Sequence, residues 1–269
     1  MNEVEQRIVG IFRERIKGRK PDVSASNSRH DGKYGHWLET QFAIGHNASN
    51  SADLFGYELK NETGSKTTFG DWSANEYIYN NPDYFDVFDG RTTLERRERF
   101  LDIFGKANEA KGGRRSWSGE PCPKIGKFNR FGQRLRIVEN NDIVAEYFYG
   151  RDGRPDRDSV VPARLRADGL VLARWYGNST PQGKRGKCLK KKLEDKFNDR
   201  GWFTCKTDET GAYSKICFGE PMTFDNWIKL VGKGIVFFDS GMYQGNKRLY
   251  SQWRADNGYW NSLITETFD

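Results

Sequence analysis

Apolar and polar positions follow two different periods along this chain, which predicts a mixture of helices and strands. Residues 3–17 place apolar side chains three or four positions apart, the spacing of an amphipathic helix whose buried face packs on a sheet. Further helices are expected at 34–44, at 92–105 behind a Thr92/Glu95 capping box, across 184–197 and after Thr223. Strand-like segments lie at 53–61, 134–139, 143–149, 169–176, 202–207, 213–218 and 234–239.

These segments favour an α/β fold in which a mixed sheet is flanked by helices. Strands dominate from residue 134 onward, whereas the first 110 residues hold helices and a short charged strand. With 269 residues the chain is long enough to bury a substantial core. We expect two lobes, 1–110 and a β-rich lobe 111–269. The C-terminal strands either stay in the second lobe or return to the first.

Composition narrows the class of protein. The net charge of +7 and the pI near 9.1 suggest a polyanionic partner, although a modest excess of this size also occurs without one. A mean hydropathy of −0.86 and the lack of a long apolar run exclude a membrane span. The N-terminus shows no secretory pattern, so we expect a cytoplasmic protein. The four cysteines (Cys122, Cys188, Cys205 and Cys217) are too widely spaced for a zinc site and are expected to be free and mostly buried.

Basic residues gather in two segments. Residues 111–136 hold eight basic side chains against one acidic one, mixed with glycine and aromatic residues. That mixture suits a loop that follows a phosphate backbone and probes a groove, and it equally suits an ordinary basic surface loop. In 184–197, Leu189, Leu193 and Phe197 form a buried stripe, so the lysine run between them is expected mostly on the solvent side.

Candidate chemistry is concentrated in Asp53-Leu-Phe-Gly-Tyr-Glu58-Leu-Lys60. Glu58 and Lys60 would share one face of a strand because side chains alternate with a period of two. Two carboxylates beside a lysine suit Mg²⁺ held against a phosphodiester. The pattern alone favours a solvated strand of alternating charge over an active site. A third carboxylate, Glu39, lies on the flank of the predicted 34–44 helix and makes a metal site more coherent.

Three short motifs follow one another within about one seventh of the chain. They are Gly32-Lys-Tyr-Gly35-His-Trp-Leu38-Glu39, Asn47-Ala-Ser-Asn50, and Asp53 with Glu58-Leu-Lys60. This block resembles the catalytic region of the MutH-like endonucleases of the PD-(D/E)XK superfamily, whose relatives include the MvaI/BcnI restriction enzymes. One departure is Ala52, which stands where a proline often precedes the aspartate.

The resemblance implies a restriction-endonuclease-like core with a DNA-recognition lobe, and it assigns roles to the motif residues. Asp53 and Glu58, with the carbonyl of Leu59, would ligate Mg²⁺. Lys60 would position or activate water, and Glu39 would hold the helix side of the site. The lobe 1–110 would then be catalytic and the lobe 111–269 would read DNA.

Histidines and basic residues offer further candidates. His30, His36 and His46 fall on three different segments, which argues against a histidine metal site. His36 precedes Glu39 by three positions, so it either contacts a phosphate or the metal water, or it caps and packs. The candidate DNA-binding residues are His36, Lys66, Arg130, Arg134, Lys184, Arg185, Arg248 and Arg254.

Three functions follow, ranked in this order. The first is a Mg²⁺-dependent Type II restriction endonuclease that cuts double-stranded DNA to 5′-phosphate and 3′-hydroxyl ends, with a cognate methyltransferase as its genetic partner only. The second is a mismatch-repair nicking endonuclease that acts with partner proteins. The third is a DNA-binding module without catalysis. The resemblance favours a monomer, whereas a two-fold symmetric target would suit a dimer.

Overall fold

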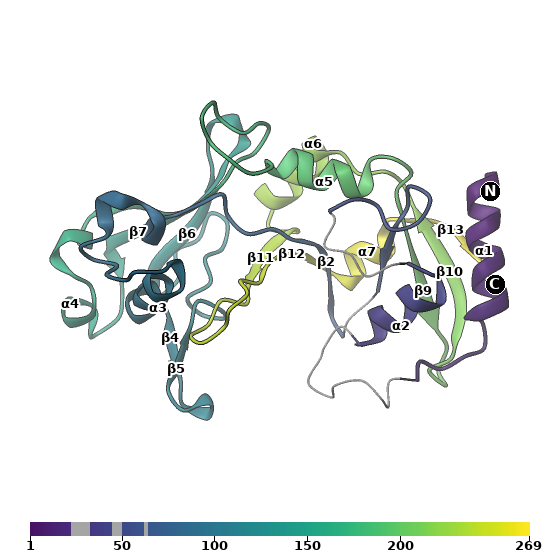
Figure 1. Cartoon of the computed structure of the whole chain (residues 1–269), viewed down its shortest axis with the longest axis horizontal. Coiled ribbons are helices and arrows are strands. Elements are labelled where there is room, and N and C mark those ends of the chain that lie inside the picture. Colours follow the sequence, from purple (N-terminus) through teal and green to yellow (C-terminus); the bar gives the residue numbers. More distant parts are fainter. Residues whose placement is uncertain (23–32, 45–49, 62–63) are drawn as a thin grey trace. The chain divides into compact units, whose positions relative to one another are not determined.

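The computed structural model describes residues 1–22, 33–44, 50–61 and 64–269 (Figure 1). His30, His46, Gly32 and residues 47–49 of the motif lie outside the described residues. The chain is a mixed α/β protein that divides into two compact units. Unit 1 comprises 1–67, 192–223 and 255–269, and unit 2 comprises 68–191 and 224–254. None of the described helices is long and apolar enough to cross a membrane.

Unit 1 is built on a four-stranded sheet with the strand order β1-β9-β10-β13. β1 pairs parallel with β9 at its edge, and the other pairs are antiparallel. Its elements are α1 (Glu3–Arg15), α2 (Lys33–Gln41), β1 (Glu58–Lys60), β9 (Trp202–Thr207), β10 (Tyr213–Gly219), α7 (Asn257–Ser262) and β13 (Ile264–Phe268). This grouping differs from a division at residue 110, because the parallel partner of β1 comes from residues beyond 200.

The two faces of this sheet have different cores. Helices α1 and α2 cover one face, where Phe12 and Leu38 join Leu59 and Phe203 in a buried apolar cluster. On the other face the Trp202 ring meets the Trp260 ring of α7 with centroids 5.0 Å apart. The predicted 3–17 helix and its inward face are confirmed, because the apolar spacing alone sets which side of the helix is buried.

Three elements cross the boundary between the units: β2 (Lys66–Asp71), α5 (Leu189–Phe197) and β12 (Ser251–Asp256). In α5, Leu189, Leu193 and Phe197 are fully buried, which confirms the predicted stripe. Because these residues repeat every four positions, they share one face of the helix.

Unit 2 contains an antiparallel sheet β3-β8-β7-β6, the β11 and β12 strands beside β2, and the hairpin β4-β5. Its elements are β3 (Glu76–Tyr77), α3 (Thr93–Phe104), β4 (Lys106–Asn108), β5 (Arg114–Ser116), β6 (Phe131–Ile137), β7 (Ile143–Asp152), α4 (Arg157–Val160), β8 (Asp168–Trp175), α6 (Phe224–Gly232) and β11 (Phe237–Ser240). The α3 capping box forms as predicted, with Thr92 and Glu95 each bonding the other's backbone. All four cysteines are free and buried, as expected.

Candidate active site

The segment before β1 is a tight turn, and the strand predicted from residue 53 is wrong at its start. Leu54 and Tyr57 form an isolated bridge, while Phe55 and Gly56 have positive φ angles of 51° and 89°. Phe55 is therefore 41 % exposed rather than buried. The turn folds Asp53 back along the strand, so that its Oδ2 accepts a hydrogen bond from the Leu59 backbone N–H at 3.0 Å.

Helix α5 and the residues after it hold this turn in place. The Ala52 N–H donates to the Asp195 carbonyl at 3.2 Å, and the Asn50 side chain donates to the Lys192 carbonyl at 2.6 Å. A Cβ on Gly56 would lie 2.2 Å from the Asp199 carboxylate, so only glycine fits at this approach. The conformation that carries Asp53 is thus fixed by contacts with a distant part of the sequence.

The pairing of β1 with β9 places Glu58 and Lys60 on the face of the sheet opposite to α1 and α2. Glu58 lies beside Trp202 and Lys60 beside Thr204, whereas Leu59 lies beside the core residue Phe203. Side chains of paired residues share a face, so Glu58 and Lys60 point toward the α5 side of the sheet. The shared face that the sequence predicted for them is confirmed, since Lys60 Nζ donates to Glu58 Oε1 at 2.8 Å.

A second lysine completes the cluster. Lys196 on α5 donates from Nζ to the same Glu58 oxygen, Oε1, at 2.6 Å. Glu58 is 2 % exposed and Lys60 8 %, and the Lys60 ammonium lies 5.0 Å from the centre of the Phe197 ring. We call Asp53, Glu58, Lys60 and Lys196 the β1 cluster.

Burial and charge shift the protonation equilibria of this cluster. Burial, and then the charge of Glu58, raise the pKa of Asp53 from 3.8 to about 6. Burial would also raise the pKa of Glu58, but the ammonium groups of Lys60 and Lys196 together hold this pKa below its usual range. Burial lowers the pKa of Lys60 against the opposing pull of Glu58.

The backbone of β1 adds an oxygen to the same edge. The Glu58 N–H donates to the Gly201 carbonyl, toward the β9 side. Successive residues of a strand direct their backbone groups to opposite sides, so Leu59 directs its N–H and carbonyl toward the open edge. The bond from the Leu59 N–H to Asp53 agrees with this direction.

The donor set suits a hard cation. Glu58 Oε2 is buried and accepts no hydrogen bond from the described residues. A buried acceptor left in this state is destabilising unless something else satisfies it. Two carboxylates and a carbonyl are the oxygen ligands that Mg²⁺ takes, with water and phosphate in the rest of its shell. No group of three or more His, Cys, Asp or Glu side chains that could hold a metal occurs among the described residues.

Glu39 and His36 lie together on α2. His36 Nδ1 is 3.2 Å from Glu39 Oε2, and the two side chains are 50 % and 35 % exposed. Helix α2 packs on the sheet face opposite to the one that carries Glu58 and Lys60, with Leu38 and Phe42 buried beneath it. Glu39 therefore does not join Asp53 and Glu58 in a three-carboxylate group.

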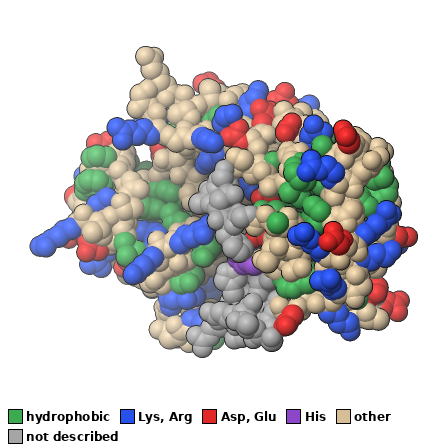
Figure 2. All heavy atoms as spheres, turned by 45° about the vertical axis from the view of Figure 1, so that its right-hand side comes forward, with side chains coloured by type: hydrophobic (Ala, Val, Ile, Leu, Met, Phe, Trp, Pro, Cys, Tyr) green, Lys and Arg blue, Asp and Glu red, His purple; other side chains and the backbone are tan. Residues whose placement is uncertain are grey.

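Several predicted DNA-binding residues already have carboxylate partners within unit 2. Arg134 bonds Glu146 at 3.2 Å and lies over the Phe128 and Phe148 rings. Arg254 bonds Asp239 at 3.1 Å and Arg248 bonds Asp71 at 3.3 Å. On the face drawn in Figure 2, the described Lys and Arg side chains are scattered among acidic and apolar ones.

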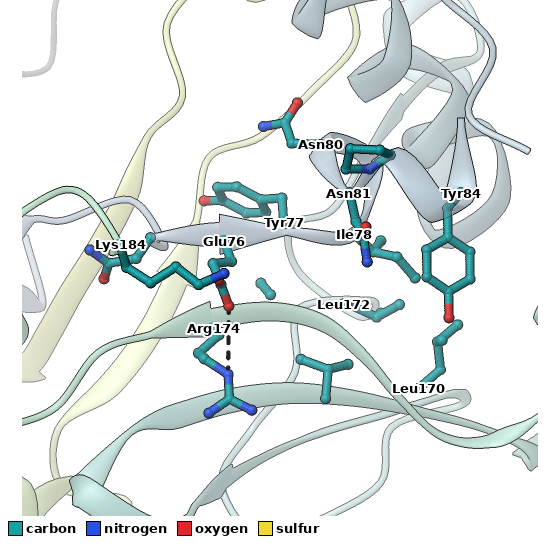
Figure 3. A pocket seen from close by; sticks show the side chains of 14 residues that line it. Glu76, Tyr77, Ile78, Asn80, Asn81, Tyr84, Leu170, Leu172, Arg174 and Lys184 are labelled. Carbon is teal, nitrogen blue, oxygen red and sulfur yellow. Dashed lines mark ion pairs between the residues drawn. The ribbon is translucent and has the colours of Figure 1, made fainter. Parts of the chain in front are cut away.

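The remaining candidates have other surroundings. Lys184 lies over Glu76, 2.6 Å from Oε1, at a pocket of about 520 Å³ whose other wall includes Ile78, Leu170 and Leu172 (Figure 3). Arg130 and Arg185 are exposed, and Lys66 opens β2 with an intermediate exposure.

Lys196 is the functional candidate that the sequence did not indicate. It comes directly before Phe197, the last residue of the buried α5 stripe, but nothing in the sequence shows that α5 faces β1. The two residues of the Lys196–Glu58 contact are 138 positions apart. Only the tertiary fold brings them together.

Comparison with known proteins shows which proteins this chain is similar to. Residues 16–268 match the family model of the LlaMI restriction endonuclease. The chain is 60 % identical over 268 residues to the Type II restriction enzyme ScrFI of Lactococcus lactis subsp. cremoris, covering 99 % of both chains. The fold is similar to that of the restriction endonuclease MvaI in complex with its cognate DNA substrate, with a TM-score of 0.59 at 13 % identity over 100 % of this chain and 98 % of the other.

Proposed function

Because the chain belongs to the LlaMI restriction endonuclease family and is a Type II, sequence-specific DNA endonuclease, we propose that the β1 cluster is its hydrolytic centre and that it works with Mg²⁺. The observation that carries this proposal is the buried Glu58 Oε2, which no described residue satisfies, beside an Asp53 carboxyl whose pKa is raised to about 6. A cation held by Asp53 and Glu58 would relieve both features.

Asp53, Glu58 and the Leu59 carbonyl would hold the ion. When bound, Mg²⁺ supplies positive charge that acidifies water and offsets charge on the phosphoryl oxygens. Lys60 would position the attacking water through its ammonium group, which already pairs with Glu58 Oε1 at 2.8 Å, and the proton that the water loses would pass to the solvent. The water oxygen bonds to phosphorus as the bond to the 3′-oxygen breaks, which leaves a 5′-phosphate and, after protonation, a 3′-hydroxyl.

Lys196 has a supporting role in this proposal. Its ammonium, with that of Lys60, keeps Glu58 ionised in spite of the burial of the carboxylate. Glu39 and His36, which lie together on α2, are candidates to contact the phosphate or an associated water. Neither residue contacts the Glu58 carboxylate directly.

The biological setting follows from the family. We propose that the substrate is double-stranded DNA, that unit 2 supplies most of the recognition contacts, and that a methyltransferase of the same specificity protects the host genome. The solved relative in complex with cognate DNA supports this substrate. We further propose a monomer that acts in the cytoplasm.

Digestion of a long mixed-sequence DNA with Mg²⁺ tests the hydrolytic centre. The wild-type protein should give discrete fragments, and Lys60→Ala or EDTA should remove them, with a loss of at least about 10³-fold in cleavage rate. Lys215→Ala is the matched control, because Lys215 is an exposed lysine on β10 of the same sheet. Cleavage by Lys60→Ala near the wild-type rate would contradict the proposal.

A further inference from the structure

The hairpin formed by β4 and β5 projects from the rest of unit 2 and ends in an exposed tip (Figure 1). A 3-10 turn, Glu109–Lys111, is followed by Gly112 and Gly113, both with positive φ. A Cβ at either glycine would meet nothing within 4 Å. The tip is therefore open to solvent, and its backbone can approach a ligand closely.

The hairpin is firmly anchored at its base. β5 pairs on its outer edge with the 242–244 segment, because the Arg115 N–H donates to Gln244 Oε1 at 2.7 Å and the Gln244 N–H donates to the Arg115 carbonyl at 3.0 Å. The Arg114 guanidinium lies 3.8 Å from the centre of the Tyr243 ring. A ribbon held in this way presents its tip in a defined direction.

A pocket of about 460 Å³ lies at the base of the hairpin and is lined by four basic and two acidic side chains. Two of the basic groups are neutralised: Lys106 bonds Glu120 at 2.6 Å and Arg154 bonds Asp152 at 2.7 Å. The other two, Arg115 and Arg130, form no ion pair with a carboxylate among the described residues. The pocket thus keeps two guanidinium groups that suit an anion.

We infer that the β4-β5 hairpin enters the major groove of DNA and that the basal pocket receives a backbone phosphate through Arg115 and Arg130. The major groove, about 12 Å wide and 8.5 Å deep, admits a two-stranded ribbon. Three residues per strand, at about 3.3 Å each, give a reach of roughly 10 Å. A ribbon inserted to that depth brings its base against the phosphates that border the groove. This inference rests on the proposed function and adds to it the element that reads the DNA.

The proposed contact of Arg115 and Arg130 with a phosphate is tested by measuring the binding of a labelled DNA duplex in EDTA at several salt concentrations. Arg130→Ala should weaken binding equally for all sequences and lower the slope of log K against log salt by about one. Arg130→Lys should keep the wild-type slope because it keeps the charge. Arg164→Ala is the matched control, an exposed arginine of the same unit that already pairs with Asp86. A wild-type slope in Arg130→Ala overturns the phosphate assignment.

The proposed insertion of the hairpin into the major groove is tested by shortening the tip of the hairpin. Residues 109–113 are replaced by Asn-Gly, which preserves the three paired positions of the hairpin. Preference for the duplex that carries the cleavage site over a scrambled duplex should fall by about tenfold or more. Lys111→Ala, a milder variant at the tip, should lower the preference in the same direction. Unchanged preference in both folded variants overturns the groove assignment.

Failure of the proposed function is distinguishable from failure of this inference. If the wild-type protein cuts no DNA with Mg²⁺, the hydrolytic proposal is wrong, whereas the salt dependence of Arg130→Ala binding still decides the phosphate contact. If the wild-type protein cuts and both sets of variants bind as it does, the hairpin is not the reading element.

Discussion

Among the described residues, each unit contains a buried glutamate that pairs with two basic side chains. The two glutamates differ in which carboxylate oxygens accept the hydrogen bonds from these side chains. In unit 2, Glu146 is 4 % exposed and divides its partners, with Arg134 on Oε2 and Arg136 on Oε1. In unit 1, Glu58 is 2 % exposed and receives both Lys60 and Lys196 on Oε1. Its Oε2 remains without a hydrogen bond from the described residues.

This difference agrees with a structural role for the Glu146 cluster and with the hydrolytic role that we propose for the Glu58 cluster. The Glu146 cluster is saturated, so it stiffens the β6 and β7 strands and leaves nothing for a ligand to satisfy. The Glu58 cluster is incomplete by one acceptor, next to a second carboxylate whose pKa is raised. Buried charge alone therefore does not indicate a functional site, whereas an unsatisfied carboxylate oxygen beside a second carboxylate supports one.

Neutralising each glutamate in turn gives the largest contrast. Glu58→Gln should reduce cleavage by about 10³-fold, because it removes a charged ligand oxygen. Glu146→Gln should leave the affinity for Mg²⁺ unchanged. Both variants should lose stability, by about 3 kcal/mol for Glu58→Gln and less for Glu146→Gln, whose arginines are more exposed. Single-turnover cleavage measures the loss of activity, and urea unfolding measures the loss of stability. Equal Mg²⁺ affinities in Glu58→Gln and Glu146→Gln would contradict the difference that we infer between the two clusters.

Asp53→Asn should show that the ionised Asp53 carboxylate is destabilising when no cation is bound. The pKa of Asp53 is raised to about 6 in the folded protein, so its contribution to stability is complete below pH 4 and is lost as the pH rises through 6. In EDTA at pH 8 the variant should therefore be more stable than the wild-type protein by about 1 to 2 kcal/mol. At pH 4 the difference should vanish. Urea unfolding at both pH values measures this, and a destabilised variant at pH 8 would contradict it.

The smallest effect is expected at Lys196. Lys196→Gln removes one of the two ammonium groups on Glu58 and should raise the affinity for Mg²⁺ by about three- to tenfold, since the site becomes more negative. Isothermal titration calorimetry without DNA measures this affinity, with Lys215→Gln as the control for a lost surface charge. A fall in affinity would instead make Lys196 part of the architecture that shapes the cation site.

Local periodicity was sufficient to predict several helices and strands, and it predicted that two residues of the candidate site, Glu58 and Lys60, lie on the same face of a strand. Glu58 and Lys60 share a face because two residues of a strand always do, and the buried stripes of α1, α5 and α6 follow from helical spacing. The Thr92/Glu95 capping box set the start of α3. These features depend only on neighbours within a few residues.

The rest of the site depends on contacts that no local pattern encodes. Leu54 and Phe55 favoured a strand, but Gly56 turns the chain where Asp199 approaches it, and the turn redirects Asp53. Arg134 lies among basic residues in the sequence and Arg254 does not, yet the partners of both, Glu146 and Asp239, come from neighbouring strands. The direction of a charged side chain was predictable only where its partner lay nearby in sequence.

The parallel pairing of β1 with β9 also has a consequence for synthesis on the ribosome. Asp53, Glu58 and Lys60 are made well before the strand beside them, which begins at Trp202, and the contact with Lys196 spans 138 residues. At about 5–20 residues per second, that interval lasts roughly 7 to 28 s. Throughout this time the nascent polypeptide carries the residues of the proposed hydrolytic centre without the β9 strand that pairs with β1. We therefore expect this centre to form only after β9 has been made.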